Sequence, residues 1–201
     1  MPPMPMFPLG AVLFPHMPLH LRVFEERYLI MMSEVIKEHA GEFGVVLIER
    51  GHEVGGGEVR FTTGTIAEIV ELAADSGYIA LEARGVRRFD VVEWQAQKPY
   101  PEAEVVECPE LVWDRALEPL QSQAEALVRR ALALASEFSE NVWSADLELS
   151  ADPVAAAWQL AGIAPIGELD QIRLLRSASM EELLRSLIEV TTDAQRGFFG
   201  F

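Results

Sequence analysis

The sequence predicts an α+β protein, in which a β-rich part with one helix (residues 1–110) precedes an α-helical bundle (residues 111–201). Short apolar stretches bounded by glycine-containing turns recur up to Val106, as is typical of strands in a small, strongly bent sheet or pseudo-barrel. After Pro109 the apolar residues recur at helical spacing instead. With 201 residues, 50% of them hydrophobic, the chain is long enough to bury a substantial core.

Residues 6–28 predict a strand, a tight loop, a second strand and the start of a helix. Residues 6–9 form a short apolar run, and residues 19–23 alternate apolar and polar side chains as a half-buried strand does. Glu25 and Glu26 mark the helix start, where the helix dipole favours anions. We expect the helix to reach about His39, before Gly41, and to bury one apolar face, made of Tyr28, Met32, Val35 and Ile36.

Five further extended segments are predicted after this helix, at residues 43–48, 62–72, 78–83, 86–94 and 100–106. The run at residues 75–77 predicts a hairpin turn, and Gly85 separates two of the strands. Three consecutive glycines at residues 55–57 predict a loop or a hairpin end.

The second part predicts about four helices. The first covers residues 113–135, with Pro119 either kinking it or setting a later start. Asp152 and Pro153 are an N-cap followed by proline at the first helical position, and Gly162 suits the end of that helix. A third helix is expected within residues 166–175, and residues 179–182 form a capping box that opens the last one.

The composition is acidic, with 16 Lys and Arg against 32 Asp and Glu and a formal net charge of −16. Acidic residues outnumber basic ones in both halves. Proteins that neutralise phosphates need clustered positive charge, so nucleic acid and anionic membranes are poor candidates as partners. Solubility is the simplest explanation of this charge.

The N-terminal 21 residues carry no charge and are largely apolar, but they lack the basic start of a signal peptide. Their six prolines also break any helix long enough to insert in a membrane, so we expect a cytoplasmic protein. Cys108 is the single cysteine, which excludes an internal disulfide. The neighbouring Glu107 and Glu110 disfavour its thiolate, which favours a structural role.

No residue pattern predicts catalysis, a cofactor or a metal. Neither lysine, Lys37 or Lys98, follows a glycine, so the chain has no phosphate-binding Walker A loop. A cysteine-rich zinc site is impossible, and the four histidines form no His-Glu-x-x-His motif. No Gly-x-Ser-x-Gly motif supports a hydrolase. Glu25 and Glu26 are adjacent at a helix start and point in different directions, which argues against an acid–base pair.

Three groups of residues, in a fixed order, carry a family resemblance. They are Phe7-Pro8-Leu9, Leu13-Phe14-Pro15 and residues 19–28; then residues 43–47 and 64–69; then residues 85–89 and 99–105. Together they resemble the LON substrate-binding domain, the N-terminal domain of ATP-dependent Lon proteases, and the helical part is similar to the end of that domain. The resemblance covers nearly the whole chain.

The resemblance implies a PUA-like β pseudo-barrel followed by helices, and a role in recognising unfolded or tagged polypeptides. The proteolytic Ser-Lys pair and the Walker A loop of Lon are not recognisable in this sequence, so we expect a non-enzymatic polypeptide-binding or adaptor module. Its length and the glycines at residues 55–57 are similar to those of free-standing LON-domain proteins of bacteria. The partners implied are unfolded or exposed polypeptide segments or a partner protein.

The predicted polypeptide-binding residues are Phe14, His16 and Met17, in a proline-flanked loop where Met17 is the expected exposed apolar contact. Six of the seven methionines fall in the first 32 residues, five of them besides Met1, which fits either core packing or an adaptable surface. The alternative is a PUA-like RNA-binding protein that uses the only compact basic spot of the first half, Arg84, Arg87 and Arg88. The tail at residues 198–201 either folds back or contacts a partner.

Overall fold

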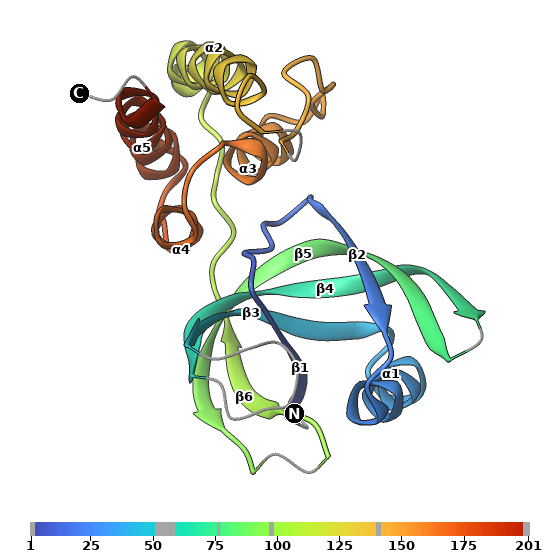
Figure 1. The fold of residues 1–201 in the computed structure, drawn as a ribbon. Helices are drawn as coiled ribbons and strands as arrows, with labels where there is room; N and C mark the ends of the chain where they lie inside the picture. Colours follow the sequence, from blue (N-terminus) through green and yellow to red (C-terminus); the bar gives the residue numbers. More distant parts are fainter. Residues whose placement is uncertain (1–2, 51–58, 76, 97–98, 140–141, 199–201) are drawn as a thin grey trace. The chain divides into compact units, whose positions relative to one another are not determined.

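The computed structural model describes residues 3–50, 59–75, 77–96, 99–139 and 142–198. The chain divides into two compact units, Met1–Pro109 and Glu110–Phe201, and each is described by itself (Figure 1). The predicted glycine-rich loop at residues 55–57 and the end of the tail, residues 199–201, lie outside the described residues.

In the part that the structure describes, the first unit contains one mixed sheet and one helix, α1 (Glu26–Glu38). The strand order is β2-β5-β4-β3-β1-β6, and β5 also pairs with β6. Every pairing is antiparallel except that of β1 with β3, which is parallel. The strands are β1 (Met4–Leu9), β2 (Pro18–Val23), β3 (Glu42–Arg50), β4 (Val59–Asp75), β5 (Tyr78–Trp94) and β6 (Glu102–Glu107).

The second pairing of β5 closes five strands, β1, β3, β4, β5 and β6, into a ring, which removes their free edges. The ring encloses a cluster of fully buried side chains: Met6, Val46, Ile66, Phe89 and Ala103. Two glycines leave room for this cluster. A Cβ atom on Gly44 would lie 2.5 Å from Met6 Sδ, and one on Gly64 would lie 2.3 Å from the main-chain oxygen of Val45.

Beyond the ring, the distal parts of β4 (residues 68–75) and β5 (residues 78–84) continue as a two-stranded arm, to which β2 adds a third strand (Figure 1). β5 therefore runs without a break through Gly85, and the prediction of two strands separated there is wrong. The glycine is needed for a close approach instead: a Cβ at Gly85 would lie 2.2 Å from the main-chain oxygen of Phe14.

Helix α1 buries Tyr28, Met31, Met32 and Val35, which recur at the spacing of one helical stripe. The expectation that Ile36 belongs to this stripe is wrong, because its side chain is 53% exposed. It lies about 100° around the helix from Val35, and Met31 completes the buried face in its place. The Tyr28 ring stacks on Phe7 of β1 with the centroids 4.3 Å apart.

A second contact ties α1 to the segment that precedes β6. The Tyr100 hydroxyl donates a hydrogen bond to the Glu34 carboxylate, and the tyrosine is only 2% exposed. Burial, together with this bond to an acidic group, raises the pKa of Tyr100 well above its ordinary value.

Among its described residues, the second unit contains a 3₁₀ turn (Arg115–Leu117) and four helices: α2 (Glu118–Ala135), α3 (Pro153–Ile163), α4 (Glu168–Leu175) and α5 (Met180–Phe198). Helix α2 packs chiefly against α5. Pro119 lies in the first turn of α2, so it sets a later start and does not kink the helix.

Side chains cap two of these helices as the sequence predicts. The Asp152 carboxylate accepts from the Ala155 amide at 2.8 Å, and the Ser179 hydroxyl accepts from the Glu182 amide at 3.1 Å. Gly162 does not end its helix, because α3 continues to Ile163 and its last turn is closed by the Ala164 amide on the Leu160 carbonyl.

Candidate functional site

The loop between β1 and β2 holds the three residues predicted to contact polypeptides, and two of them are not exposed. Phe14 is 1% exposed and Met17 is 6% exposed, so the expectation of an exposed apolar contact at Met17 is wrong. The main chain of the loop is fastened to the arm. The His16 amide donates to the Gly85 carbonyl at 2.8 Å, and the Gly85 amide donates to the Met17 carbonyl at 3.0 Å.

His16 is the exposed member of the three, at a positive φ of 63°. The buried Thr65 hydroxyl holds the same loop by donating to the Leu13 carbonyl at 2.6 Å. The methionines also serve packing: Met6, Met31 and Met32 are all fully buried. Methionine content therefore does not mark a surface in this chain.

The junction of β1, β2 and the start of α1 forms a small hollow of about 170 Å³, which we name the β1–β2 groove. Its walls are mostly apolar, and the stacked pair Phe7 and Tyr28 lies on one side. Phe24, at the end of β2, is 57% exposed on this lining. The lining residues are Phe7, Leu9, His20, Leu21, Arg22, Val23, Phe24, Glu25 and Tyr28.

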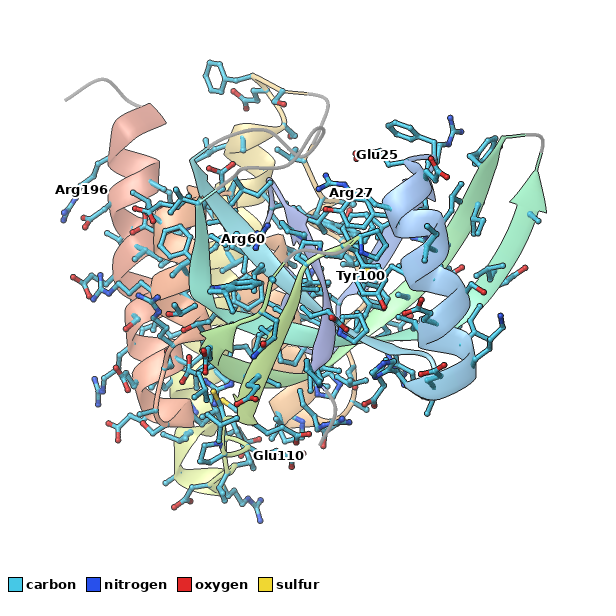
Figure 2. All side chains as sticks on the ribbon, turned by 90° about the horizontal axis from the view of Figure 1, so that it is seen from below. Glu25, Arg27, Arg60, Tyr100, Glu110 and Arg196 are labelled. Atoms are coloured by element: carbon cyan, nitrogen blue, oxygen red, sulfur yellow. The ribbon has the colours of Figure 1, made fainter. Side chains whose placement is uncertain are left out.

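An ion pair stabilises one end of the groove. Arg27 Nε lies 3.1 Å from Glu25 Oε2, and the Arg27 guanidinium lies 4.4 Å from the centre of the Tyr28 ring (Figure 2). Glu25 is thus held in an ion pair at the N-terminus of α1, which fits a positioning role. None of Phe14, His16 and Met17 lines the groove.

A second hollow, of about 530 Å³, lies on the arm. The register places Ala73 opposite Ala80 and Glu71 opposite Glu82, while His20 and Arg22 of β2 stand opposite Glu82 and Ala80. Residues that face each other across strands share one face of a sheet, so small alanines form a floor between polar neighbours. In the parts of the chain that the structure describes, no group of three or more His, Cys, Asp or Glu side chains is arranged to hold a metal ion.

The basic spot that an RNA-binding function would need is occupied by protein contacts. Arg84 lies 3.7 Å from Glu68. Arg87 contacts Glu42 at 2.8 Å and Glu107 at 3.1 Å. The bond to Glu42 is the main reason that the pKa of Arg87 is raised above its ordinary value.

Arg88 is 7% exposed and donates to the Pro109 carbonyl at 2.8 Å. Burial lowers its pKa from the ordinary value, opposed by Cys108 and Asp90. Burial also raises the pKa of the Cys108 thiol, with a further contribution from Asp90, whose Oδ2 lies 3.6 Å from the sulfur. The raised pKa of Cys108 disfavours its reactive thiolate, which fits a structural role. The bond from Arg88 to a main-chain carbonyl also fits a structural role.

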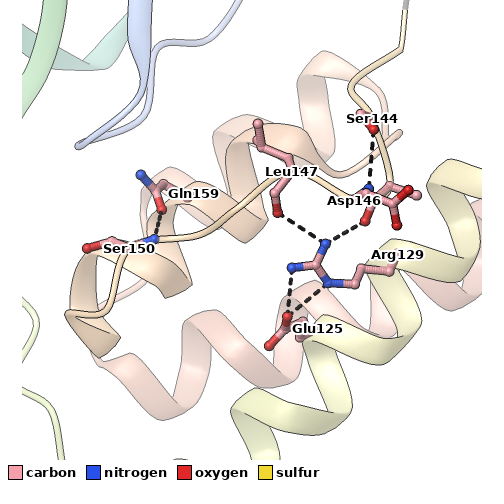
Figure 3. Close-up of polar contacts among 8 residues, drawn as sticks. Glu125, Arg129, Ser144, Asp146, Leu147, Ser150 and Gln159 are labelled. Atoms are coloured by element: carbon pink, nitrogen blue, oxygen red, sulfur yellow. Dashed lines mark hydrogen bonds and ion pairs between the residues drawn. The ribbon is translucent and has the colours of Figure 1, made fainter.

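The helical unit has a groove of its own, about 840 Å³ in volume, between α2 and residues 146–151. Arg129 organises its wall by donating to the carbonyls of Ala145 at 2.5 Å and Leu147 at 3.2 Å, while pairing with Glu125 (Figure 3). Carboxylates outnumber guanidinium groups along this groove, with Glu118, Glu125, Asp146 and Glu148 beside Arg115 and Arg129.

A ring of five strands with a three-stranded arm, followed by a helical unit, defines an α+β class of domain. Two solved structures share it. The chain is similar to a Lon N-terminal domain protein from Xanthomonas campestris, with 25% identity, a TM-score of 0.67, and coverage of 94% of this chain and 98% of that one. The N-terminal domain of a Mycobacterium avium complex Lon protease is 20% identical, with a TM-score of 0.66 and coverage of 95% and 98%.

The sequence model of the ATP-dependent protease La (LON) substrate-binding domain matches residues 3–193. The chain belongs to this family and is a substrate-recognition module of the LON type. It is 26% identical over 194 residues to the Lon protease of Syntrophus aciditrophicus and 30% identical over 140 residues to that of Anaeromyxobacter dehalogenans.

The matches to these two proteases cover 93% and 67% of this chain, but only 24% and 16% of the relatives' own length. The matched domain is the substrate-binding one and not a catalytic one. Of the helices that the structure describes, none has the length and apolar character required to cross a membrane.

The groove residues Phe24, Leu21 and Arg22 are not among the contacts predicted from the sequence. The sequence carries no signal for the exposure of Phe24, which is an apolar residue placed between a strand and the N-cap of a helix. An apolar residue at such a junction is usually buried, so exposure there could only be learned from the structure.

Proposed function

We propose that this chain binds exposed apolar segments of unfolded polypeptides in the β1–β2 groove and does not itself catalyse a reaction. The groove is the observation that carries the proposal, because it joins an apolar lining to the exposed ring of Phe24. Isolated exposed apolar residues are common on proteins, but one beside an apolar hollow is typical of a binding surface.

The family supports this choice, because the related Lon proteases contain this substrate-binding domain as one part of a longer chain. We further propose that the chain presents bound polypeptides to a partner protein, as an adaptor does. His16 stays a predicted contact of the neighbouring loop, because it is exposed while Phe14 and Met17 are buried.

The RNA-binding alternative is disfavoured by the contacts of its candidate residues. Arg87 is held between two carboxylates, and Arg88 is buried against a main-chain carbonyl. Phosphate contacts need basic side chains that can reach solvent, and the net charge of −16 opposes them further.

The test compares binding of the full chain to a fluorescent, permanently unfolded protein and to the same protein folded. We expect saturable binding of the unfolded form in the range of tens of micromolar, a weak affinity suited to transient capture. Phe24→Asp should weaken binding, because it places a charge at the groove. Val92→Asp is the matched control, since Val92 is 67% exposed on β5 and lines neither hollow of this unit. No saturable binding by the unmodified chain would refute the proposal.

A further inference from the structure

Within the residues that the structure describes, β2 is an edge strand whose main chain is paired on one side only. It lies at the end of the sheet order, and its partner among these residues is β5. One bond shows which residues of β2 are hydrogen-bonded to β5: the Gly85 amide donates to the Met17 carbonyl, so Met17 is a bonded position. Pro18, which follows Met17 in the chain, has no amide hydrogen and is not a bonded position. In an antiparallel pair the bonded positions alternate, so Leu19 and Leu21 turn their peptide groups toward β5.

The peptide groups of His20 and Arg22 therefore point away from β5. Among the described residues, no hydrogen bond outside the β2–β5 ladder uses the main chain of either residue. An edge of this kind presents donors and acceptors that match only another extended main chain. The occupant of such an edge is therefore a polypeptide in strand conformation.

The β1–β2 groove lies along this same strand, because residues 20–23 are part of its lining. A strand added beside β2 would turn alternate side chains to the face that carries Leu21 and Val23. Val23 is 2% exposed and Leu21 is partly exposed, so this face is apolar. Apolar residues are expected at those alternate positions of the ligand.

The position between them faces Arg22, which is exposed. Arg22 lies 5.6 Å from the centre of the Tyr78 ring, and no carboxylate of the described residues forms an ion pair with it. A residue directly opposite Arg22 shares its face of the sheet, where an opposite charge is favoured. Glu71 and Glu82 share this face and line the same hollow, yet neither forms an ion pair with Arg22.

We propose that the chain binds polypeptides by strand addition at the free edge of β2, with preference for an acidic residue flanked on each side by an apolar one. The inference rests on the proposed function and specifies the kind of segment that is bound and the mode of binding.

The probe is a blocked seven-residue peptide with a central Glu, a Val on each side and Thr beyond. Two forms carry N-methyl groups at alternate amides. Because a strand turns only every second amide toward its neighbour, one form should lose binding at least about tenfold and the other should keep it. Equal behaviour of both forms would overturn strand addition.

Protein variants test the same edge from the other side. His20→Pro deletes an outward amide, which an edge strand tolerates, and should weaken peptide binding at least about tenfold. His20→Ala is its matched control, because it also removes the imidazole that lines the groove but keeps the amide, and the proline variant should bind at least about tenfold more weakly than this control. Arg22→Glu should reverse the preference, so that a peptide with a central Lys binds more tightly than the peptide with a central Glu. This result does not depend on the proline variant folding.

The two failures can be told apart. If the unmodified chain does not bind unfolded protein at all, the proposed function fails and the inference fails with it. If it binds unfolded protein but the His20→Pro and Arg22→Glu variants bind as tightly and with the same preference, then strand addition alone is overturned.

Discussion

Gly44 and Met6 offer a quantitative test of the ring closed by β5 and β6. An alanine Cβ at position 44 would lie 2.5 Å from Met6 Sδ and 3.1 Å from Phe89 Cζ, inside a cluster that has no exposed surface. Overpacking of this kind costs about 1–3 kcal/mol. Met6→Val removes Sδ and Cε and adds one methyl branch at Cβ, and should cost about 2 kcal/mol by itself.

The two changes should compensate each other. In the Met6→Val background the sulfur is gone and the methyl group of the alanine at position 44 fills part of the vacated space, so Gly44→Ala should cost much less there, and the 3.1 Å approach to Phe89 Cζ is what remains. The coupling between the changes is then about 1–3 kcal/mol in favour of the double variant. Because the chain has two compact units, the free energy of opening is best measured by amide exchange in the ring strands and not by one global signal.

Gly64 provides the matched comparison. A Cβ there would lie 2.3 Å from the main-chain oxygen of Val45 as well as 2.6 Å from Phe89 Cζ. The first contact is backbone, so Phe89→Leu should not rescue Gly64→Ala. If Gly44→Ala proves equally costly with and without Met6→Val, the described packing inside the ring is wrong.

Three further outcomes are expected. Tyr100→Phe removes the hydroxyl that donates to Glu34 and should lower the free energy of unfolding by about 1–2 kcal/mol near neutral pH. Since the pKa of Tyr100 is raised on folding, this stability is fully present below about pH 10 and is lost as the pH rises further, so urea denaturation of the phenylalanine variant should show a shallower alkaline loss. Arg129→Lys keeps the charge but not the planar fork, so amide exchange should quicken in residues 142–151 while the ring strands stay unchanged. Arg88→Ala should lower the melting temperature without changing any affinity for structured RNA; a salt-dependent affinity that falls with this change would instead favour the RNA-binding alternative.

The α+β class and the capping residues of the helices were predictable because their signals are local. Asp152 caps its helix, and the hydroxyl of Ser179 accepts from the amide three residues on, as short spacing rules require. Ile36 shows the limit of this approach. Its helix has more apolar residues than one stripe can bury, and only the packing partners decide that Met31 is inside and Ile36 outside.

The groove and the free edge were beyond sequence reasoning for a different reason. Their parts lie far apart in the chain: β2 pairs with the distal half of β5, while β6 pairs with its other half. Gly85 gave a misleading local signal, because a glycine within a strand can mark a break, a bulge or a close approach of another main chain. The glycine alone does not distinguish these cases. The prolines around Phe14 and Met17 predicted an exposed loop. Its main-chain hydrogen bonds to Gly85 of β5 instead keep the loop against the sheet.

The tip of the β4–β5 hairpin can be used to label or lengthen this protein. Asp75 and Tyr78 form the last paired position, and the Cβ direction of Gly77 meets no atom within 4 Å. The two register shifts between β4 and β5 lie nearer the ring, so residues added symmetrically at the tip keep every existing rung in place. Each added pair would lengthen the arm by about 3.4 Å. A fluorophore or a short tag placed there would report on the arm without disturbing either the ring or the edge of β2.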